Sequence, residues 1–517
     1  MTRETALQQI ASQKTWDVLV IGGGSTGLGT ALEATSRGYS TLLLEQSDFA
    51  KSTSGKSTKL VHGGVRYLAQ GNIKLVREAN IERGLLLKNA PHLVKNQSFI
   101  IPIYSRWDKL KYTIGLKFYD WIAGWSSLGS SVFISAEEVM QKLPTVNTKK
   151  LIGGVLYHDG QFDDSRLAIN LAQTIFDNGG FAINYMKVTG LIKNSSTING
   201  VSAFDVESGN FFEIMAKAVV NATGVFVDDI LQMDDPFFRK IISVSQGVHL
   251  VLDKKFLSSS YALMIPKTSD GRVLFIIPWH DKVLLGTTDT PVNKVSLEPV
   301  ALDSEIDFIL NTAASYLNQV PARKDVLSVF AGLRPLAAPA HEAGATKEIS
   351  RSHKILVSPS KLFTILGGKW TTYRKMGEDM IDKIENQLQW KHQPVITPGL
   401  SIHGFDKEVN YSEPFYFYGS DKKYINEIIN NMANEWISQD LHIHKAQVIW
   451  AVKEEMARSV EDVLSRRTRA LLLNAKEAVR IAPVVAFIMA DVLGKDDKWI
   501  TEQVNNFNIV AKNYILN

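Results

Sequence analysis

The 517-residue sequence contains no cysteine. This absence excludes disulfides, thiolate catalysis, and zinc or iron–sulfur sites built on cysteine ligands. Neither sign of charge dominates, because 57 basic residues stand against 53 acidic ones and leave a net charge of +4. Such a balance argues against a nucleic-acid partner, whereas a mild positive excess suits an anionic substrate or an anionic membrane surface.

Long apolar segments are also missing. Residues 1–15 are polar and lack the apolar core of a secretory signal, so we expect no signal peptide. The longest apolar run, residues 481–490, is about half of the roughly 20 residues that a membrane-spanning helix needs. Any membrane contact is therefore expected to come from the surface of the protein.

The length predicts more than one domain. A chain of 517 residues exceeds what one hydrophobic core usually supports, so we expect two or three domains. Residues 16–46 have the pattern of a strand, a glycine turn, a helix and a second strand. The apolar runs 18–21 and 41–44 are continuous, which is typical of strands covered on both faces. This order predicts a Rossmann-type βαβ unit.

The glycine turn of this unit has the spacing of a dinucleotide-binding fingerprint. Gly22 makes the tight turn, Gly24 lets the backbone approach a pyrophosphate, and Gly27 allows the helix to pack closely on the strand. The pyrophosphate would then lie at the positive N-terminus of the helix. Glu45 ends the second strand, where a carboxylate can bond ribose hydroxyls. The fingerprint alone does not separate FAD from NAD.

Further pieces of a nucleotide-binding domain lie far downstream. Residues 218–222 read as a buried strand, and residues 356–376 read as strand, glycine turn and helix. Residues 187–221 alternate β-branched and polar positions around the turn signal Asn199-Gly200, which predicts a hairpin or meander. After a linker at 394–399 the chain is largely helical. One apolar helix face is predicted there from Val452, Met456, Val460, Val463 and Leu464.

Several ordered segments resemble the FAD-dependent glycerol-3-phosphate dehydrogenases. Residues 57–68 (STKLVHGGVRYL) are similar to the segment of that family that contacts the flavin, and residues 220–224 (VNATG) to its second FAD strand. The matches continue through 286–289 (GTTD), 332–336 (GLRPL), 367–374 (GGKWTTYR) and 461–468 (EDVLSRRT). Single motifs of this kind occur across amine and amino-acid oxidases, whereas the ordered set is specific.

The resemblance implies an α/β fold of the glutathione-reductase/amino-acid-oxidase type. We expect a discontinuous Rossmann-like FAD-binding domain (14–80, 150–232 and 330–393), an inserted antiparallel β-sheet cap domain (81–149 and 233–329), and a C-terminal helical domain (400–517). The cofactor is expected to be non-covalent FAD. The residues assigned to it are Gly22, Gly24, Gly27, Glu45, Ser57, Thr58, Gly63, Gly64, Ala222, Gly224, Gly368 and Thr371.

The implied reaction is the oxidation of sn-glycerol 3-phosphate to dihydroxyacetone phosphate. Hydride transfer from a secondary alcohol needs a flavin facing the carbon, a base for the hydroxyl proton, and positive charge for the phosphate. The family resemblance assigns catalysis to His249, Arg334 and Lys369. Substrate binding is assigned to Arg66, Tyr67, Arg334, Arg351 and Lys369.

The histidines differ in their interpretation. His249 lies in a β-like run, where a histidine bonded to the backbone is the plain alternative to a base or a substrate-orienting group. The resemblance favours the second role. His62, beside two glycines, is interpreted as structural, and His442 and His444 as solvated. We expect no metal site.

The resemblance also implies an electron acceptor and a location. Dehydrogenases of the family are peripheral membrane enzymes that reduce quinone, whereas its oxidases use oxygen and carry an insertion that we do not find here. The relatives in eukaryotes add a transit peptide and calcium-binding EF-hands, patterns missing from this sequence. We therefore expect a bacterial enzyme on the cytoplasmic face of the inner membrane. The oligomeric state stays open, with a homodimer as one option.

Residues 107–125 are the first candidate for the membrane surface. Aromatic residues are interleaved there with lysines, a composition found at lipid interfaces, although aromatics that fill the core of the cap would give the same pattern. The second candidate is the basic group Arg466, Arg467 and Arg469 in the helical tail.

Two rival functions remain. An amine or amino-acid oxidase on the same fold needs one carboxylate-binding arginine and an apolar pocket, whereas several cations are predicted here. A flavin-binding sensor without turnover would have little use for His249, Arg334 and Lys369 together.

Overall fold

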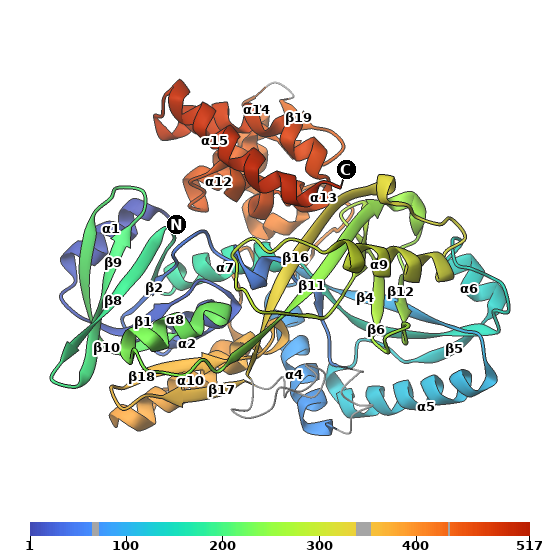
Figure 1. The fold of residues 1–517 in the computed structure, drawn as a ribbon, viewed down its shortest axis with the longest axis horizontal. Coiled ribbons are helices and arrows are strands. Elements are labelled where there is room, and N and C mark those ends of the chain that lie inside the picture. The colour runs from blue at the N-terminus through green and yellow to red at the C-terminus, as the bar shows by residue number, and fades with distance from the viewer. Residues whose placement is uncertain (65–71, 338–352, 433–434, 517) are drawn as a thin grey trace.

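The computed structural model describes residues 1–64, 72–337, 353–432 and 435–516 (Figure 1). Two sheet-containing lobes lie side by side, and the helices of the C-terminal region, drawn in red, sit above the junction between them. One lobe contains β1, β2, β10 and the N-terminus. The other lobe contains β4, β6 and β12.

Eight of the described strands form the first sheet, in the order β17-β18-β10-β1-β2-β7, with β8 and β9 extending from β10. Its central pairs, β1 with β2 and with β10, are parallel. The strands are β1 (Trp16–Ile21), β2 (Thr41–Leu44), β7 (Phe181–Ile183), β8 (Met186–Asn194), β9 (Thr197–Asp205), β10 (Phe211–Asn221), β17 (Lys354–Val357) and β18 (Leu362–Leu366).

The predicted βαβ unit is present in this sheet. Strand β1 leads through the glycine turn into α2 (Ser25–Ser36), and β2 follows. Helix α2 packs against α7 (Asp164–Asp177) and α10 (Tyr373–Leu388). The residues of β1 and β2 are almost all buried and apolar, as expected for strands covered on both faces.

The predicted meander is present, but its first turn lies elsewhere. Strands β8, β9 and β10 pair antiparallel in sequence order, yet Asn199-Gly200 lies inside β9, and the chain reverses at Ser195. Ser195 adopts a positive φ of 58° at that reversal. Gly200 serves packing instead, since a Cβ there would stand 2.5 Å from the carbonyl oxygen of Ile214.

Ten of the described strands form the second sheet, mainly antiparallel, and β11 and β16 are its longest strands. The members are β3 (Leu60–Val61), β4 (Val94–Ile103), β5 (Val132–Ser135), β6 (Gly153–Phe162), β11 (Ile242–Asp253), β12 (Ala262–Ile265), β13 (Leu274–Trp279), β14 (Lys282–Gly286), β15 (Thr290–Val292) and β16 (Val326–Ala337). Strands β3, β6 and β16 pair here, whereas the predicted bounds group most of their residues with the FAD-binding domain.

The remaining helices cover the two sheets or form the C-terminal domain. Around the sheets lie α1 (Arg3–Ser12), α4 (Ile73–Asn89), α5 (Arg106–Ala123), α6 (Ala136–Lys142), α8 (Val227–Asp234) and α9 (Asp303–Tyr316). The C-terminal domain contains α11 (Lys422–Asn430), α12 (Lys445–Glu454), α13 (Ala470–Leu473), α14 (Ala475–Leu493) and α15 (Asp497–Ala511), with the short strands β19 (Trp436–Ser438) and β20 (Ile443–His444). No helix within the described ranges is long and apolar enough to span a membrane.

The single helix expected over residues 452–464 is interrupted. Helix α12 ends at Glu454, Met456 takes a positive φ of 53°, and a π-helical turn, Asp462–Arg467, follows. All five apolar residues predicted for the face are buried, as expected. Apolar spacing therefore identified the core residues correctly and missed the break between them.

Candidate active site

A cavity of about 790 Å³ lies between the two sheets. On one side it meets the carboxyl ends of β1, β2 and β10, and on the other side it meets β11 and β16. Ligands of open α/β sheets bind at the carboxyl ends of the strands, and the cavity lies within the size range of cofactor sites.

The glycine turn forms the first wall of the cavity. Gly22 has a φ of 111°, and a Cβ at this residue would stand 2.7 Å from the carbonyl oxygen of Ala222. A Cβ at Gly27 would stand 1.8 Å from the carbonyl oxygen of Gly22, so α2 can start this close to β1 only with glycine there. The first turn of α2 carries no side-chain cap at Gly24, which leaves its N-terminus facing the cavity.

Glu45 lies at the end of β2 and lines the cavity. Its Oε2 accepts a hydrogen bond from the Gly23 backbone N–H at 2.6 Å, and its Oε1 accepts one from the Ser47 N–H at 2.9 Å. Burial raises the pKa of this carboxyl. Because a carboxylate offers about four acceptor positions, Glu45 keeps capacity for a ribose hydroxyl.

Ser57 and Thr58 line the cavity from a tightly bonded turn. The Asp164 carboxylate accepts hydrogen bonds from the Ser57 hydroxyl and from the Lys59 ammonium, each at 2.7 Å. Lys59 and Asp164 are fully buried as an ion pair. The pair fixes the residues on either side of Thr58, whose hydroxyl lies 2.9 Å from Nε2 of His249.

His249 lies on β11 and is 2% exposed. Its ring stacks on Phe330 of β16, with the ring centroids 5.0 Å apart. Burial, together with the charges of Arg334 and Lys59, holds the pKa of His249 well below its usual range. The imidazole is therefore neutral near pH 7 and able to accept a proton.

Arg334 lies on the neighbouring strand and faces the same cavity. Its guanidinium donates to the Thr287 hydroxyl at 3.1 Å and lies 3.3 Å from Oδ1 of Asp289. A Cβ on Gly247 would stand 2.2 Å from Nη2 of Arg334, so this glycine makes room for the guanidinium. Gly286 makes room for the ring of His249 in the same way, with 2.2 Å to its Cδ2.

Lys369 and its neighbours complete the wall at the end of β18. Gly368, Lys369 and Thr371 all line the cavity. The Trp370 indole N–H donates to the Ser54 backbone carbonyl at 2.8 Å and so joins this turn to the segment that follows β2. The structure therefore brings together the three residues predicted for catalysis, which are separated by 120 residues in the chain.

The other predicted residues fall into three groups. Ala222 and Gly224 line the cavity with the residues above, whereas Gly27, Gly63 and Gly64 do not line it. Gly63 instead packs against Tyr119 of α5 and donates its N–H to Asp159 at 3.1 Å. The predicted substrate residues Arg66, Tyr67 and Arg351 lie outside the residues that the structure describes.

Sequence reasoning missed several residues of the cavity wall. His62, interpreted as structural, lines the cavity. Lys56 and Asp159 also line it, and each forms an ion pair, Lys56 with Glu298 at 2.6 Å and Asp159 with Arg83 at 2.7 Å. No sequence signal marked Asp159. Asp289 does not line the cavity but contacts Arg334, and it belongs to the matched segment 286–289, where a polar run directly after a strand could have indicated its role.

The wall residues fit a flavin dinucleotide. A glycine turn at a helix N-terminus suits a pyrophosphate, Glu45 suits a ribose, and the part of the cavity beside Arg334 and His249 is left for a flat ring system.

Comparisons with known proteins agree with this geometry. The profile of the family described as FAD dependent oxidoreductase matches residues 17–367, and that of the C-terminal domain of alpha-glycerophosphate oxidase matches residues 361–500. The human mitochondrial glycerol-3-phosphate dehydrogenase is 36% identical over 97% of this chain and 74% of its own length. The chain belongs to the FAD-dependent glycerol-3-phosphate dehydrogenase family.

Other members of the family confirm the likeness over nearly the whole chain. The Saccharomyces cerevisiae mitochondrial glycerol-3-phosphate dehydrogenase is 35% identical over 98% of this chain and 91% of its own. The structure of the glycerol-3-phosphate dehydrogenase from Bacillus halodurans complexed with FAD is 29% identical, with a TM-score of 0.79 over 99% of this chain and 97% of that one. The predicted fold class and FAD as the cofactor of the family are thereby confirmed.

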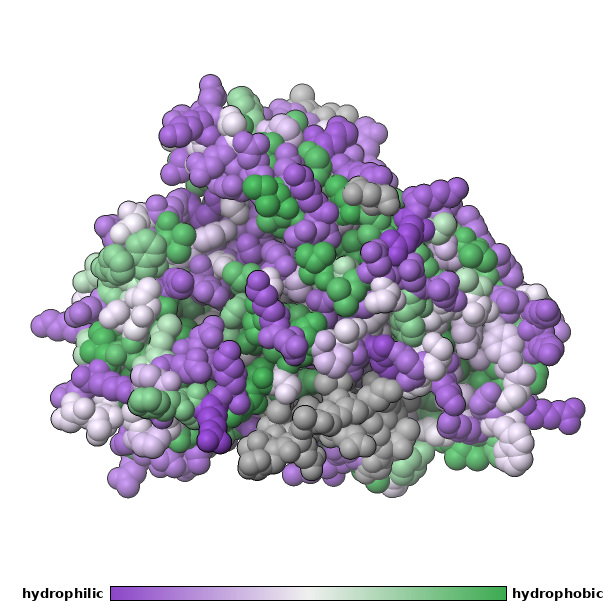
Figure 2. Space-filling model, in the orientation of Figure 1, coloured by the Kyte–Doolittle hydropathy of each residue, from purple (hydrophilic) through white to green (hydrophobic). Residues whose placement is uncertain are grey.

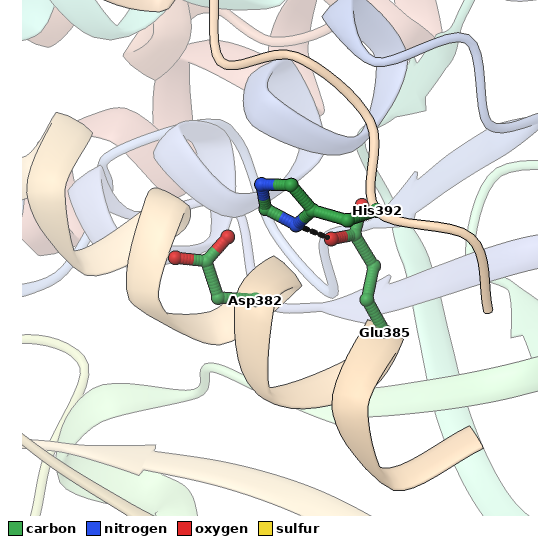
Figure 3. A group of neighbouring side chains, drawn as sticks. All are labelled: Asp382, Glu385 and His392. Carbon is green, nitrogen blue, oxygen red and sulfur yellow. Dashed lines mark hydrogen bonds and ion pairs between the residues drawn. The ribbon is translucent and has the colours of Figure 1, made fainter. Parts of the chain in front are cut away.

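A second group of ligand-type side chains lies away from the cavity. Figure 3 shows Asp382 and Glu385 on α10 and His392 in the segment that follows, with a hydrogen bond from His392 to Glu385 of 2.6 Å. The guanidinium of Arg37 lies 2.8 Å from Asp382 and 3.1 Å from Glu385. Because the guanidinium of Arg37 already contacts both carboxylates, we do not interpret this group as a metal site.

Proposed function

We propose that the protein oxidises sn-glycerol 3-phosphate to dihydroxyacetone phosphate with FAD as the oxidant. One observation carries the proposal: a neutral imidazole and two cationic side chains, His249, Arg334 and Lys369, line a single cavity that begins at a dinucleotide-binding turn. The names of the relatives support the same substrate.

The side chains divide the work of oxidising a secondary alcohol. Bound FAD supplies the hydride acceptor. His249 takes the hydroxyl proton at Nε2. Its Nδ1 is enclosed by protein atoms, whereas its Nε2 contacts Thr58, a residue that also lines the cavity. Arg334 and Lys369 hold the phosphate, for which the planar fork of an arginine is suited.

Anaerobic reduction of the bound flavin tests the substrate. We expect glycerol 3-phosphate to bleach the flavin absorbance, whereas glycerol, the same alcohol without the phosphate, does not at matched concentration. Bleaching by amino acids in place of glycerol 3-phosphate would transfer the protein to the amine-oxidase branch. A flavin that none of these compounds reduces would favour a sensor without turnover.

We further propose that the electrons pass to a quinone at a membrane surface. Helix α5 supports this proposal because it presents an apolar stripe to solvent, with Trp107 81% and Trp121 75% exposed. The stripe repeats every three or four residues and lies opposite the buried face of the helix. It consists of Trp107, Leu110, Ile114, Phe118 and Trp121, whereas Leu116, Tyr119 and Ala123 are buried.

Basic side chains flank this apolar stripe. Arg106, Lys109, Lys111 and Lys117 are exposed on α5, and the ammonium of Lys109 also lies 3.7 Å from the centre of the Phe133 ring. An exposed apolar stripe with basic borders is the pattern of a helix that lies in a lipid interface. Figure 2 shows apolar side chains at the lower edge of the molecule, where Figure 1 places α5.

The second candidate for the membrane surface is wrong. Arg466, Arg467 and Arg469 are all buried, at 4%, 0% and 2% exposure. Buried arginines cannot meet a lipid surface.

Binding to anionic vesicles tests the α5 surface. Replacing Arg106, Lys111 and Lys117 with glutamate should release the protein, since each basic residue near an anionic surface contributes about 1 kcal/mol. The wild type should also bind more weakly as salt rises. The matched control replaces three exposed lysines elsewhere, Lys149, Lys255 and Lys407. Equal loss in both triple variants would point to net charge instead of α5.

The acceptor is tested separately from the membrane. We expect quinone reduction to exceed hydrogen peroxide formation at matched acceptor concentrations. Stoichiometric peroxide in the presence of quinone would assign the protein to the oxidase branch, to which the glycerophosphate oxidase domain at 361–500 also has a likeness. Location on the cytoplasmic face of a bacterial inner membrane, and a homodimer, stay predictions from the sequence.

A further inference from the structure

Two neighbouring arginines of the C-terminal domain reach into the flavin-binding lobe. Arg466 and Arg467 end the π-helical turn that follows α12, and both contact Asp48, which is fully buried. Nε of Arg466 lies 2.5 Å from Oδ2 of Asp48, and Nη2 of Arg467 lies 3.0 Å from its Oδ1. Asn184 donates a further hydrogen bond to Asp48 at 3.1 Å.

Asp48 belongs to a segment that borders the cofactor, residues 45–54, here named the cofactor loop. The carboxylate of its first residue, Glu45, accepts a hydrogen bond from the Gly23 N–H at 2.6 Å. The hydroxyl of its last residue, Ser54, accepts one from the Ser25 N–H at 3.0 Å. Both ends of the loop are thus bonded to the glycine turn. The cavity is lined by loop residues Glu45, Gln46, Ala50, Lys51, Ser52, Thr53 and Ser54.

A second ion pair joins the cofactor loop to the C-terminal domain. The ammonium of Lys51 lies 2.9 Å from Oε2 of Glu461, and the other oxygen of Glu461 lies 2.9 Å from Arg466. Burial alone would raise the pKa of Glu461, but the charges of Arg466 and Lys51 lower it to about 2. Glu461 therefore stays charged near pH 7.

Buried charges of this kind depend on each other. Burial alone would raise the pKa of Asp48, but the charges of Arg467 and Arg466 hold it well below its usual range. Removing one partner of a buried pair is strongly destabilising, because it leaves the other charge buried without compensation. Without the arginines, Asp48 would have to take up a proton or move toward water, and either change would loosen its hold on the cofactor loop.

We propose that Arg466 and Arg467 are positioning residues that hold the cofactor loop against the glycine turn, so that the C-terminal domain sets how tightly FAD is retained. None of the described residues after 400 lines the cavity, so this effect acts only through the loop. The inference rests on the FAD site of the proposed function and extends it to a region that does not line the cavity.

Titration of the apoprotein with FAD tests the proposal. We expect Arg466→Met and Arg467→Met to raise the dissociation constant of FAD by at least about tenfold, as loss of a charged contact in a buried cluster does. The KM for glycerol 3-phosphate, measured at saturating FAD, should change less than about twofold, because neither arginine lines the cavity. A conservative Arg466→Lys should restore part of the affinity.

The matched control removes a buried arginine that does not touch the loop. Arg37 pairs with Glu33, Asp382 and Glu385, so Arg37→Met should lower the melting temperature and leave the FAD affinity near that of the wild type. Should Arg467→Met fail to fold, the partly exposed bridge between Lys51 and Glu461 offers the milder variant Glu461→Gln, since Glu461 does not line the cavity.

Folded variants that bind FAD as tightly as the wild type would overturn the proposal. Because binding of FAD is measured without substrate, this test can contradict the positioning role of the arginines without contradicting the proposed oxidation of glycerol 3-phosphate. A protein that loses FAD affinity in these variants but never oxidises glycerol 3-phosphate would remove the proposed function and keep this inference.

Discussion

Two glycines shape the catalytic wall through the side chains they lack. Any Cβ on Gly247 would collide with the guanidinium of Arg334, and any Cβ on Gly286 would collide with the ring of His249. The register of β11 and β16 then places His249 opposite Phe330 and Ser245 opposite Arg334, so both functional side chains face the cavity. The placement of Arg334 and His249 therefore depends on two residues that have no side chain.

Replacement of His249 tests its assignment as the base. We expect His249→Asn to lower kcat more than it raises KM, because proton transfer is needed only in the transition state. Since burial and nearby charge keep the pKa of His249 well below its usual range, the wild type should keep its activity as the pH falls to about 6.5. A variant with normal kcat and raised KM would assign His249 to substrate orientation.

Replacement of the two cations tests the phosphate site. Arg334→Ala and Lys369→Ala should each lower kcat/KM by roughly ten- to a hundredfold, the effect of losing a charged hydrogen bond of about 1.5–3 kcal/mol. Far-UV circular dichroism and the melting temperature should stay close to the wild type. Unchanged kcat/KM in both variants would place the phosphate elsewhere in the cavity.

At the scale of single elements, the sequence predicted best where one local constraint decides the structure. The glycine turn, α2 and the buried strands β1 and β2 follow from residue type and spacing alone. The turn at Ser195 could not be predicted in this way. Asn199-Gly200 has the sequence of a turn, but Gly200 is required by its close contact with a neighbouring strand. Pairing of Arg466 and Arg467 with Asp48 was also beyond prediction, since basic residues usually lie on the surface and nothing local marks a partner.

The glycine turn provides the prediction at this scale. Gly24→Val adds a branched side chain at the N-terminus of α2, where even a Cβ stands 3.0 Å from Oγ of Ser54, so we expect apoprotein without bound flavin. The control is Gly38→Asn, because Gly38 has a positive φ of 87° but nothing within 4 Å of its Cβ position. Asparagine tolerates that backbone conformation. The flavin-to-protein absorbance ratio measures the flavin content of both variants. Full flavin content in Gly24→Val would contradict the assignment of Gly24 to the cofactor site.

At the scale of the whole molecule, His403 links the C-terminal domain to α7. Its Nδ1 lies 2.7 Å from Asp177 and its Nε2 lies 2.9 Å from Asp421. Although burial alone would lower it, hydrogen bonds to these two carboxylates raise the pKa of His403 to about 9. A group whose pKa is raised by folding stabilises the folded state fully below its unfolded pKa, about 6.5, and loses that contribution as the pH rises through the folded value.

The stability of His403→Gln should therefore depend on pH. Its free energy of unfolding should fall below that of the wild type by about 1–3 kcal/mol at pH near 6, and the difference should shrink as the pH rises through about 9. Urea denaturation at a series of pH values measures this difference. A difference that is constant or grows with pH would show that the histidine does not act through its charge.

The separation of Asp48 from its arginines has a consequence for synthesis on the ribosome. The partners lie 418 and 419 residues further along the chain, so a nascent polypeptide exposes the glycine turn long before Arg466 and Arg467 emerge. Strand β18, which pairs with β10, also follows only after the strands of the second sheet. N-terminal segments generally fold first during translation. Under the proposed positioning role, the cofactor loop lacks its contacts to Arg466 and Arg467 until the last domain is made, so truncated chains should retain FAD more weakly than the full chain.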